Sequence, residues 1–400
     1  MTRIVVVSER YHPFGGAELA THLILKLLKS ENCDIRVLTG QKNIDKIHGV
    51  KYLYVPYLAA HTKVQRWINE VKLRSETWFK DLIAQNDIVY IPRTAYPIIP
   101  LAKKSGKKVI VHLHDYHPIS YSSVMFHDEK YDPYIFHEMK KTLKFEIMKN
   151  KNNRKNLFSF SFAFLINLCK FWISKADEIL CVSNRQLAII QQAYLSDIEK
   201  KLRVIYNPLP KVPKIEKKLE DHILMYLGGD HYVKGFHTVL NASMRLLYGD
   251  HMFRILLLGS YENTSILLID RLNDIVGGAY KMMGHIGYQE VLNYHSISHA
   301  LIFTSLLEEP LPYVILESML SGTIPIASRV GGVPEIVKGT FAEKMLFKPG
   351  DVDELVDRIQ ILLSLSNEQI IDLGLSLRET ILHRFHLDAI KKKLINTFLV

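Results

Sequence analysis

The chain has 400 residues, of which 48% are hydrophobic and 23% are charged, so it is long enough for two domains and is not a wholly disordered protein. Its three cysteines, at positions 33, 169 and 181, contain no C-x-x-C pair, which excludes a disulfide framework and a cysteine zinc site. Residues 1–200 carry 30 Lys and Arg against 19 Asp and Glu, a charge of +11, whereas residues 201–400 carry 21 against 22. This asymmetry has two interpretations. The first half has an anionic partner, such as a membrane surface, a phosphorylated acceptor or nucleic acid, or its basic residues simply form a solvated surface.

Export and membrane insertion are not expected. The first apolar run, residues 4–7, is shorter than the roughly 7–15 residues that a signal peptide needs. The longest charge-free apolar stretch, residues 156–169, is shorter than the roughly 20 residues that span a bilayer. We expect a cytoplasmic protein.

In the first half, short apolar runs alternate with amphipathic stretches, which predicts a parallel, doubly wound sheet. The expected strands are 3–8, 35–38, 87–91, 108–112 and 178–182, and the expected helices are 17–28 and 64–85.

A proline- and lysine-rich segment, residues 208–221, predicts an interdomain linker. The alternation then resumes, which predicts a second Rossmann-like domain of similar size. Here the expected strands are 223–227, 254–258, 299–303 and 324–327, and the expected helices are 235–247, 288–296, 313–321 and 334–337.

Two carboxylates, Glu309 and Glu317, flank the predicted start of the helix at 312–321, where Pro312 suits the first turn. The free N–H groups and positive dipole end of this helix lie between them and favour a phosphate. Two acceptors around an anion site suit a ligand with phosphates in the middle and hydroxyls at both ends, such as a nucleotide sugar.

Three further segments place glycines between a predicted strand and helix: Gly228-Gly229 with Lys234, Gly15-Gly16, and Gly331-Gly332. Each glycine pair alone is a weak signal, because turns use glycine everywhere. Lys234 can supply a point charge to a phosphate.

In this order the motifs resemble the retaining nucleotide-sugar glycosyltransferases of family 4, which have the GT-B fold. The strongest element is the seven-residue gap between Glu309 and Glu317, followed by Ser-Met-Leu-Ser-Gly-Thr-Ile-Pro325. The supporting elements are Gly15-Gly16, His114-Asp115-Tyr116, Ser183, Asn207-Pro208, Lys234-Gly235, Gly331-Gly332-Val-Pro-Glu335 and His383-Arg384-Phe385.

The resemblance implies an α/β fold with two Rossmann-like, doubly wound parallel-sheet domains that face a central cleft. Residues 1–207 would bind the acceptor, 208–221 would be the linker, 222–384 would bind the nucleotide sugar, and 385–400 would cross back as a helix to the first domain.

The resemblance also implies site roles. Glu317 would hold the ribose hydroxyls, Glu309 the sugar hydroxyls, and Lys234 the departing diphosphate. The N–H groups of Tyr313 and Val314 would also contact the donor. A first loop containing Gly15 and Gly16 would contact it too, and Gly16 would let that loop close over the phosphates. Ile286 would lie in a base-contacting loop. His114 would face the transferred sugar as a catalytic residue together with Lys234 and Glu309, whereas we expect His112 to face the opposite side of the sheet.

The sequence departs from the family at Gly229, where the family usually has an arginine that contacts the diphosphate. The usual Gly-Phe-Gly after the first Glu is replaced by Pro310-Leu311-Pro312. Asp351-Val-Asp353 formally matches a metal-binding D-x-D, but Asp351 and Glu354 at a helix start indicate a capping box. We therefore expect no metal or resident cofactor.

A basic stretch, residues 139–155, holds seven basic residues and one acidic residue and precedes an aromatic-rich stretch, 157–172. This combination favours a membrane-interface element, with Phe162, Phe164 or Trp172 entering the headgroup layer, and equally fits a buried helix after a solvated basic loop. Nucleic acid is not expected as a partner.

The resulting hypothesis is a retaining, hexosyltransferase-type enzyme that moves a sugar from a nucleotide diphosphate sugar to a lipid-linked or glycan acceptor, in the cytoplasm or peripherally at the inner membrane face. One alternative is a catalytically weak GT-B protein that binds a sugar nucleotide as a regulatory or scaffolding subunit. Another is a sugar-nucleotide epimerase, which the context of Glu309 and Glu317 disfavours.

Overall fold

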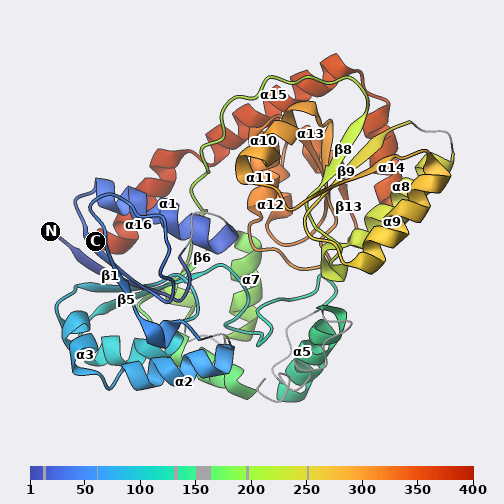
Figure 1. The fold of residues 1–400 in the computed structure, drawn as a ribbon. Helices are drawn as coiled ribbons and strands as arrows, with labels where there is room; N and C mark the ends of the chain where they lie inside the picture. The colour runs from blue at the N-terminus through green and yellow to red at the C-terminus, as the bar shows by residue number, and fades with distance from the viewer. Residues whose placement is uncertain (12–14, 61, 130–133, 150–163, 195–197, 250–251) are drawn as a thin grey trace. The chain divides into compact units, whose positions relative to one another are not determined.

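The computed structural model describes the chain except residues 12–14, 61, 130–133, 150–163, 195–197 and 250–251 (Figure 1). The described residues form two compact units. The first contains residues 1–125, 129–210 and 387–400, and the second contains 126–128 and 211–386.

The first unit is built on a seven-stranded parallel sheet in the order β3-β2-β1-β4-β5-β6-β7. Its central strands are buried on both faces, which explains why they read as continuous apolar runs. The sequence predicted five of these strands to within one residue and missed the short edge strands β3 and β7. The strands are β1 Arg3–Ser8, β2 Asp34–Thr39, β3 Lys51–Tyr54, β4 Ile88–Ile91, β5 Lys108–Leu113, β6 Glu178–Cys181 and β7 Leu202–Val204.

One predicted helix of this unit is wrong. Residues 64–85 form two helices, because the chain turns at Arg74–Glu76, where the amides of Arg74, Ser75 and Glu76 close the last turn of α2. The helices of the unit are α1 Gly16–Ser30, α2 Lys63–Leu73, α3 Thr77–Ala84, α4 Ile99–Lys104, α5 Ile135–Lys149, α6 Ile166–Ile173, α7 Asn184–Ala193 and α16 Leu387–Leu399, with short 3-10 turns η1 Pro56–Leu58, η2 Tyr96–Ile98 and η4 Glu199–Lys201.

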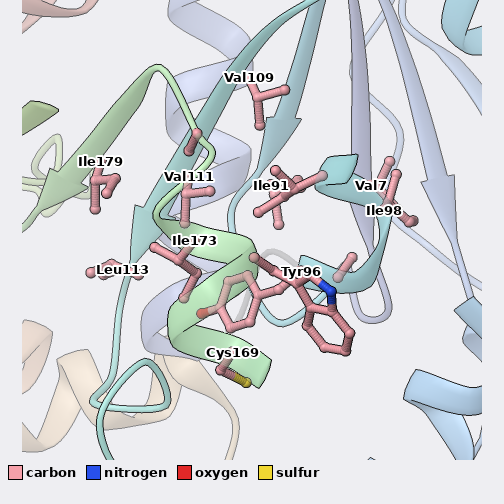
Figure 2. Packing of buried hydrophobic residues seen from close by; sticks show 14 of the residues in the cluster. Val7, Ile91, Tyr96, Ile98, Val109, Val111, Leu113, Cys169, Ile173 and Ile179 are labelled. Atoms are coloured by element: carbon pink, nitrogen blue, oxygen red, sulfur yellow. The ribbon is translucent and has the colours of Figure 1, made fainter. Parts of the chain in front are cut away.

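The core of the first unit lies between the sheet and α6. Figure 2 shows Val111 and Leu113 of β5 near Ile173 of α6, all fully or almost fully buried. Trp172 packs its ring edge against Trp67 of α2 at 5.9 Å between centroids. These contacts fix α2 and α6 to one face of the sheet.

The second unit has a six-stranded parallel sheet in the order β10-β9-β8-β11-β12-β13. The four predicted strands and four predicted helices are present to within one or two residues. The strands are β8 Ile223–Tyr226, β9 Arg254–Leu258, β10 Tyr280–Gly284, β11 Ala300–Phe303, β12 Ile324–Ser328 and β13 Leu346–Phe347. The helices are η5 Tyr232–Lys234, α8 Phe236–Tyr248, α9 Asn263–Val276, α10 Tyr288–Ile297, α11 Tyr313–Leu320, α12 Val333–Val337, α13 Phe341–Lys344, α14 Val352–Leu363 and α15 Asn367–Arg384.

The predicted linker packs along the second unit. Lys217 Nζ donates to the carbonyls of His295 and Ser298 and to Thr323 Oγ1, at 2.6–3.1 Å. Arg378 of α15 donates to the carbonyls of Val212 and Pro213. The proline-rich segment is therefore held against the second unit by the hydrogen bonds of two half-buried cations.

Candidate functional site

In each parallel sheet the order in which successive strands are added reverses at one point, and charged side chains lie at that point. In the second unit the reversal lies between β8 and β11, and the segments after these two strands carry Lys234 and Glu309. The carboxyl ends of parallel strands at such a reversal are the usual ligand crevice of open α/β sheets.

Lys234 and Glu309 form an ion pair across this crevice. Lys234 Nζ lies 2.5 Å from Glu309 Oε1, and Ser305 Oγ donates to the same oxygen at 3.2 Å. The backbone of Lys234 is fixed as well, because its carbonyl accepts from the Tyr226 hydroxyl and from Thr304 Oγ1. A cation and a carboxylate thus stand together at the point where the sequence predicted phosphate and sugar contacts.

The Gly331-Gly332 loop holds Glu309 from the other side. Gly332 N donates to Glu309 O at 2.9 Å, and Gly331 N donates to Glu308 Oε2 at 2.6 Å. Gly331 has φ +49°, and a Cβ atom there would lie 1.8 Å from Glu309 O, so only glycine fits. The structure brings this predicted motif to the predicted carboxylate.

The start of α11 lies between the two carboxylates in sequence. Pro312 is the N-cap rather than a first-turn residue, and no side chain of the described residues caps the helix. The N–H groups of the first turn, which include those of Tyr313 and Val314, have no acceptor within the helix. They point from a positive helix end and can receive an anion.

Glu317 lies one turn further into α11. Burial raises the pKa of its carboxyl to about 7, although the neighbouring Tyr288 hydroxyl favours the ionised form. Tyr288 opens α10 directly after the loop that contains Ile286, and its hydroxyl oxygen is buried. No cation among the described residues contributes to this shift, so Glu317 is a partly desolvated acceptor that suits neutral hydroxyl groups.

Gly229 has a structural reason for departing from the family pattern. Its φ is +59°, and a Cβ atom would lie 2.7 Å from Ser260 O. The loop after β8 is tied to the loop after β9, since Asp230 N donates to Ser260 O and Glu262 N donates to Asp230 Oδ2. An arginine at position 229 does not fit this backbone.

In the first unit, His114 follows β5 at the carboxyl edge of the sheet. Its Nε2 is buried without a partner among the described residues. Burial, followed by His112 and the charge of Arg93, holds the pKa of His114 well below its usual range. At neutral pH His114 is therefore a neutral imidazole that can hydrogen-bond hydroxyl groups.

The expectation that His112 faces the other side of the sheet is wrong. Positions two apart in a strand share a face, and the two imidazole rings lie 4.3 Å apart. The Nδ1 atom of His112 is 2.9 Å from the buried Tyr90 hydroxyl. The ring of His112 therefore packs against the ring of His114.

Gly15 and Gly16 stand at the N-terminus of α1, where Gly15 is the N-cap with φ +95° and no side chain of the described residues caps the helix. Gly15, Gly16 and His114 lie in the first unit, and the second unit holds Lys234, Ile286, Glu309, Tyr313, Val314 and Glu317. Their roles in catalysis and donor binding stay predictions.

Sequence reasoning missed the charged cluster of the first unit. Glu9 directly follows β1 and Arg93 follows β4, the two strands between which this sheet reverses. Arg66 of α2 and Arg93 both donate to Glu9 Oε1, at 3.1 and 3.0 Å. A charged residue after each of two adjacent parallel strands was the signal that could have revealed it.

Two further expectations meet the structure in part. Asp351 is the N-cap of α14 and accepts from Glu354 N at 3.0 Å, but Glu354 accepts from Lys348 N rather than from Asp351 N, so the box is not reciprocal.

In the aromatic stretch, Phe162 lies outside the described residues, Phe164 and Phe171 are about half exposed, and Trp172 is buried at 8% exposure. The expectation that Trp172 could enter a headgroup layer is wrong, because it packs on Trp67.

Known proteins share this fold. Residues 210–372 match the model of the family described as Glycosyl transferases group 1. No curated protein matches the chain.

Similar solved structures cover nearly the whole chain. Anabaena HepE, in complex with UDP and glucose, is 16% identical with a TM-score of 0.66, and the match covers 99% of each chain. Sucrose-phosphate synthase from Thermosynechococcus elongatus is 16% identical with a TM-score of 0.70, covering 99% of this chain and 98% of that one. The lipopolysaccharide outer core galactosyltransferase WaaB is 18% identical with a TM-score of 0.64, covering 99% of each.

These likenesses confirm the expected fold class. The two parallel-sheet units are those of the GT-B fold, and residues 210–372 are similar to the group 1 glycosyltransferase model. Among the described residues, no helix is long and apolar enough to cross a bilayer.

Proposed function

We propose that the protein is a retaining glycosyltransferase that moves a hexosyl group from a nucleotide diphosphate sugar to a lipid-linked or glycan acceptor. The family match over residues 210–372 supports the transferase class. The similar HepE structure, a complex with UDP and glucose, supports a nucleotide sugar as the donor.

The observation that carries the proposal is the Lys234–Glu309 pair beside the uncapped start of α11. Lys234 and the first-turn N–H groups would neutralise the diphosphate. Glu309 would accept hydrogen bonds from sugar hydroxyls, and Glu317 from the ribose. Ile286 would contact the base.

The proposed reaction needs no protein base. In a same-face attack, the acceptor hydroxyl approaches as the sugar–phosphate bond breaks, and the departing phosphate oxygen takes the hydroxyl proton. Lys234 would stabilise the charge that develops on that phosphate. The neutral His114 would hydrogen-bond the transferred sugar, and no metal or resident cofactor is part of the proposal.

The acceptor side of the proposal includes a membrane surface. Phe136 of α5 and Phe171 of α6 are exposed at 74% and 54%, and Lys140, about one turn after Phe136 in α5, is exposed as well. Exposed aromatic rings with basic residues are typical of peripheral binding to anionic lipid. The WaaB likeness, to an enzyme named for lipopolysaccharide, is in keeping with a lipid-linked acceptor.

The second candidate is a weakly active sugar-nucleotide-binding subunit, and the conformation of Gly229 favours it, because the backbone there excludes the family's second cation. The intact Lys234–Glu309 pair opposes it.

A donor panel tests both. UDP-, GDP- and ADP-hexoses are incubated with the protein, with and without lipid extract, and nucleoside diphosphate release is measured beside a Lys234→Met variant. Release that depends on Lys234 and rises with extract supports the transferase. Nucleotide binding without release supports the subunit. If the protein neither binds a nucleotide nor releases one, the proposal is overturned.

A further inference from the structure

A buried salt-bridge network occupies the reversal point of the first sheet. Glu9 follows β1 and Arg93 follows β4, so both lie at the carboxyl edge, where a doubly wound sheet binds its ligand. The proposed function gives neither residue a role, and neither belongs to a motif that the sequence singled out.

Arg93 joins two elements. Its Nε donates to Glu9 Oε1 at 3.0 Å, and its Nη1 donates to Glu18 Oε1 at 2.5 Å. Glu9 stands at the end of β1 and Glu18 in the first turn of α1. One planar guanidinium therefore ties the first turn of the helix to the edge of the sheet, which a lysine could not do with the same geometry.

The Glu9 end of the network is a rigid anchor. The Glu9 side chain is 1% exposed, and its Oε1 also accepts from Arg66 at 3.1 Å and from the Thr94 hydroxyl at 2.9 Å. Burial disfavours the charge, but Arg93 and Arg66 together hold the pKa of Glu9 below its usual range. Glu9 is thus ionised at neutral pH, and releasing Arg93 would leave this buried charge with Arg66 as its one cation partner among the described residues.

The Glu18 end controls the uncapped helix start. Gly15, the N-cap, offers no side chain, and Arg93 holds the Glu18 carboxylate, whose Oε2 lies 3.5 Å from where a Cβ atom at Gly15 would stand. No side chain among the described residues caps the first-turn N–H groups, and Arg93, through Glu18, ties this turn to the sheet.

We infer that Arg93 is a positioning residue, which fixes the first turn of α1, from Gly15 to Glu18, at the carboxyl edge of the first sheet. The inference rests on the proposed function for its catalytic consequence, since Gly15 and Gly16 are there expected to meet the donor. Arg93 acts through Glu18 and need not touch the substrate.

Hydrogen exchange tests the positioning without any substrate. The Leu19 amide donates to Gly15 O at 2.9 Å and reports on the first turn. Arg93→Lys and Glu18→Gln should each speed exchange at Leu19 at least tenfold while leaving the amides of β1 protected. Glu18→Gln leaves Glu9 paired and therefore remains informative if Arg93 variants fold poorly.

Arg3→Met is the matched control, because it removes another arginine ion pair of the same sheet, Arg3–Asp87, from the opposite strand end. It should leave Leu19 exchange unchanged. Equal Leu19 protection in wild type, Arg93→Lys and Glu18→Gln overturns the inference, whatever the activity.

Kinetics separate positioning from simple stability. With a donor that the wild type turns over, Glu18→Gln and Arg93→Lys should each lower kcat at least tenfold and change nucleoside diphosphate affinity less than twofold, and the double variant should lose no more than the stronger single one. Multiplied losses in the double variant overturn action through Glu18. If the wild type releases nucleotide from no donor, the proposed function fails and the exchange experiment alone decides the inference.

Discussion

We expect ionised Glu317 to lower the stability of the ligand-free protein and to strengthen binding of the donor. Replacing Glu317 with glutamine separates these two effects. Burial raises the pKa of this carboxyl from 4.5 to about 7. Each pKa unit corresponds to 1.36 kcal/mol, so at pH 8 the ionised side chain costs the folded protein about 3 kcal/mol relative to an unperturbed carboxyl.

The sign of the pH dependence follows from the raised pKa. The folded protein binds a proton more tightly than the unfolded chain, so the favourable contribution is fully present below pH 4.5 and is lost as the pH rises through 7. Glu317→Gln removes this dependence. Its gain in unfolding free energy should be about 2 kcal/mol larger at pH 8 than at pH 5, which corresponds to about 4–8 °C in the melting temperature of a unit of this size.

Glu317→Gln should stabilise the fold but weaken the binding of nucleoside diphosphate. A carboxylate that accepts from ribose hydroxyls contributes about 1.5–3 kcal/mol, so Glu317→Gln should weaken nucleoside diphosphate binding about 10- to 100-fold at pH 8. Wild-type affinity should fall below pH 7 as the carboxyl protonates, whereas the variant's affinity should stay flat. Calorimetric titration and thermal melts at pH 5, 6, 7 and 8 measure both quantities.

The exposed Glu290→Gln of α10 is the control and should change neither quantity. The reasoning is refuted if Glu317→Gln melts at the wild-type temperature at pH 8 and binds nucleotide as tightly as the wild type.

Three other variants test the remaining residues. Lys234→Met should lower nucleotide release about 10- to 100-fold, because a charge-assisted contact worth about 1.5–3 kcal/mol is lost from the departing phosphate; unchanged release would remove Lys234 from the reaction. His114→Asn should lower turnover about 2- to 10-fold without changing the shape of the pH–rate profile between pH 5 and 8, since the imidazole is already neutral there; a lost inflection would show that His114 titrates. Lys140→Glu with Phe171→Ser should reduce sedimentation with anionic vesicles at low salt while donor hydrolysis persists; wild-type protein that stays in the supernatant would leave the basic face as solvated surface.

The sequence predicted the sheets well for a physical reason. Central parallel strands are buried on both faces, so β1 and β9 read as unbroken apolar runs and were placed to the residue. Edge strands such as β3 and β13 are short or half exposed, and nothing in their composition separates them from loops.

Site residues could be predicted where they belong to a motif with a fixed spacing along the chain. They could not be predicted where the site depends on an ion pair between residues that follow different strands. Glu309 and Gly331 were both found, and their contact follows from strand order. The Glu9–Arg93 pair was not found, because 84 residues separate its members and only the topology brings β1 beside β4. The His112 error had a simpler origin, since the two-residue period of a strand places it on the same face as His114.

The backbone at Gly229 limits which side chains can supply a positive charge to the loop after β8, and this gives the last prediction. The φ of +59° and the approach of Ser260 O to 2.7 Å of a Cβ position come from the tie between the loops after β8 and β9. Restoring the family's arginine here should not restore a phosphate contact. Gly229→Arg should instead break the tie, lower the melting temperature and leave nucleotide affinity no better than wild type.

Two alanine variants separate the causes. Gly229→Ala and Gly278→Ala both place a side chain at positive φ, which costs about 1 kcal/mol, but nothing lies within 4 Å of a Cβ at Gly278. Only Gly229→Ala meets a backbone oxygen, so it should destabilise the protein by at least 1 kcal/mol more than Gly278→Ala. Equal losses, or tighter nucleotide binding by Gly229→Arg, would mean that the loop can open to admit a second cation, and Lys234 would then no longer be the main charge available to the leaving group.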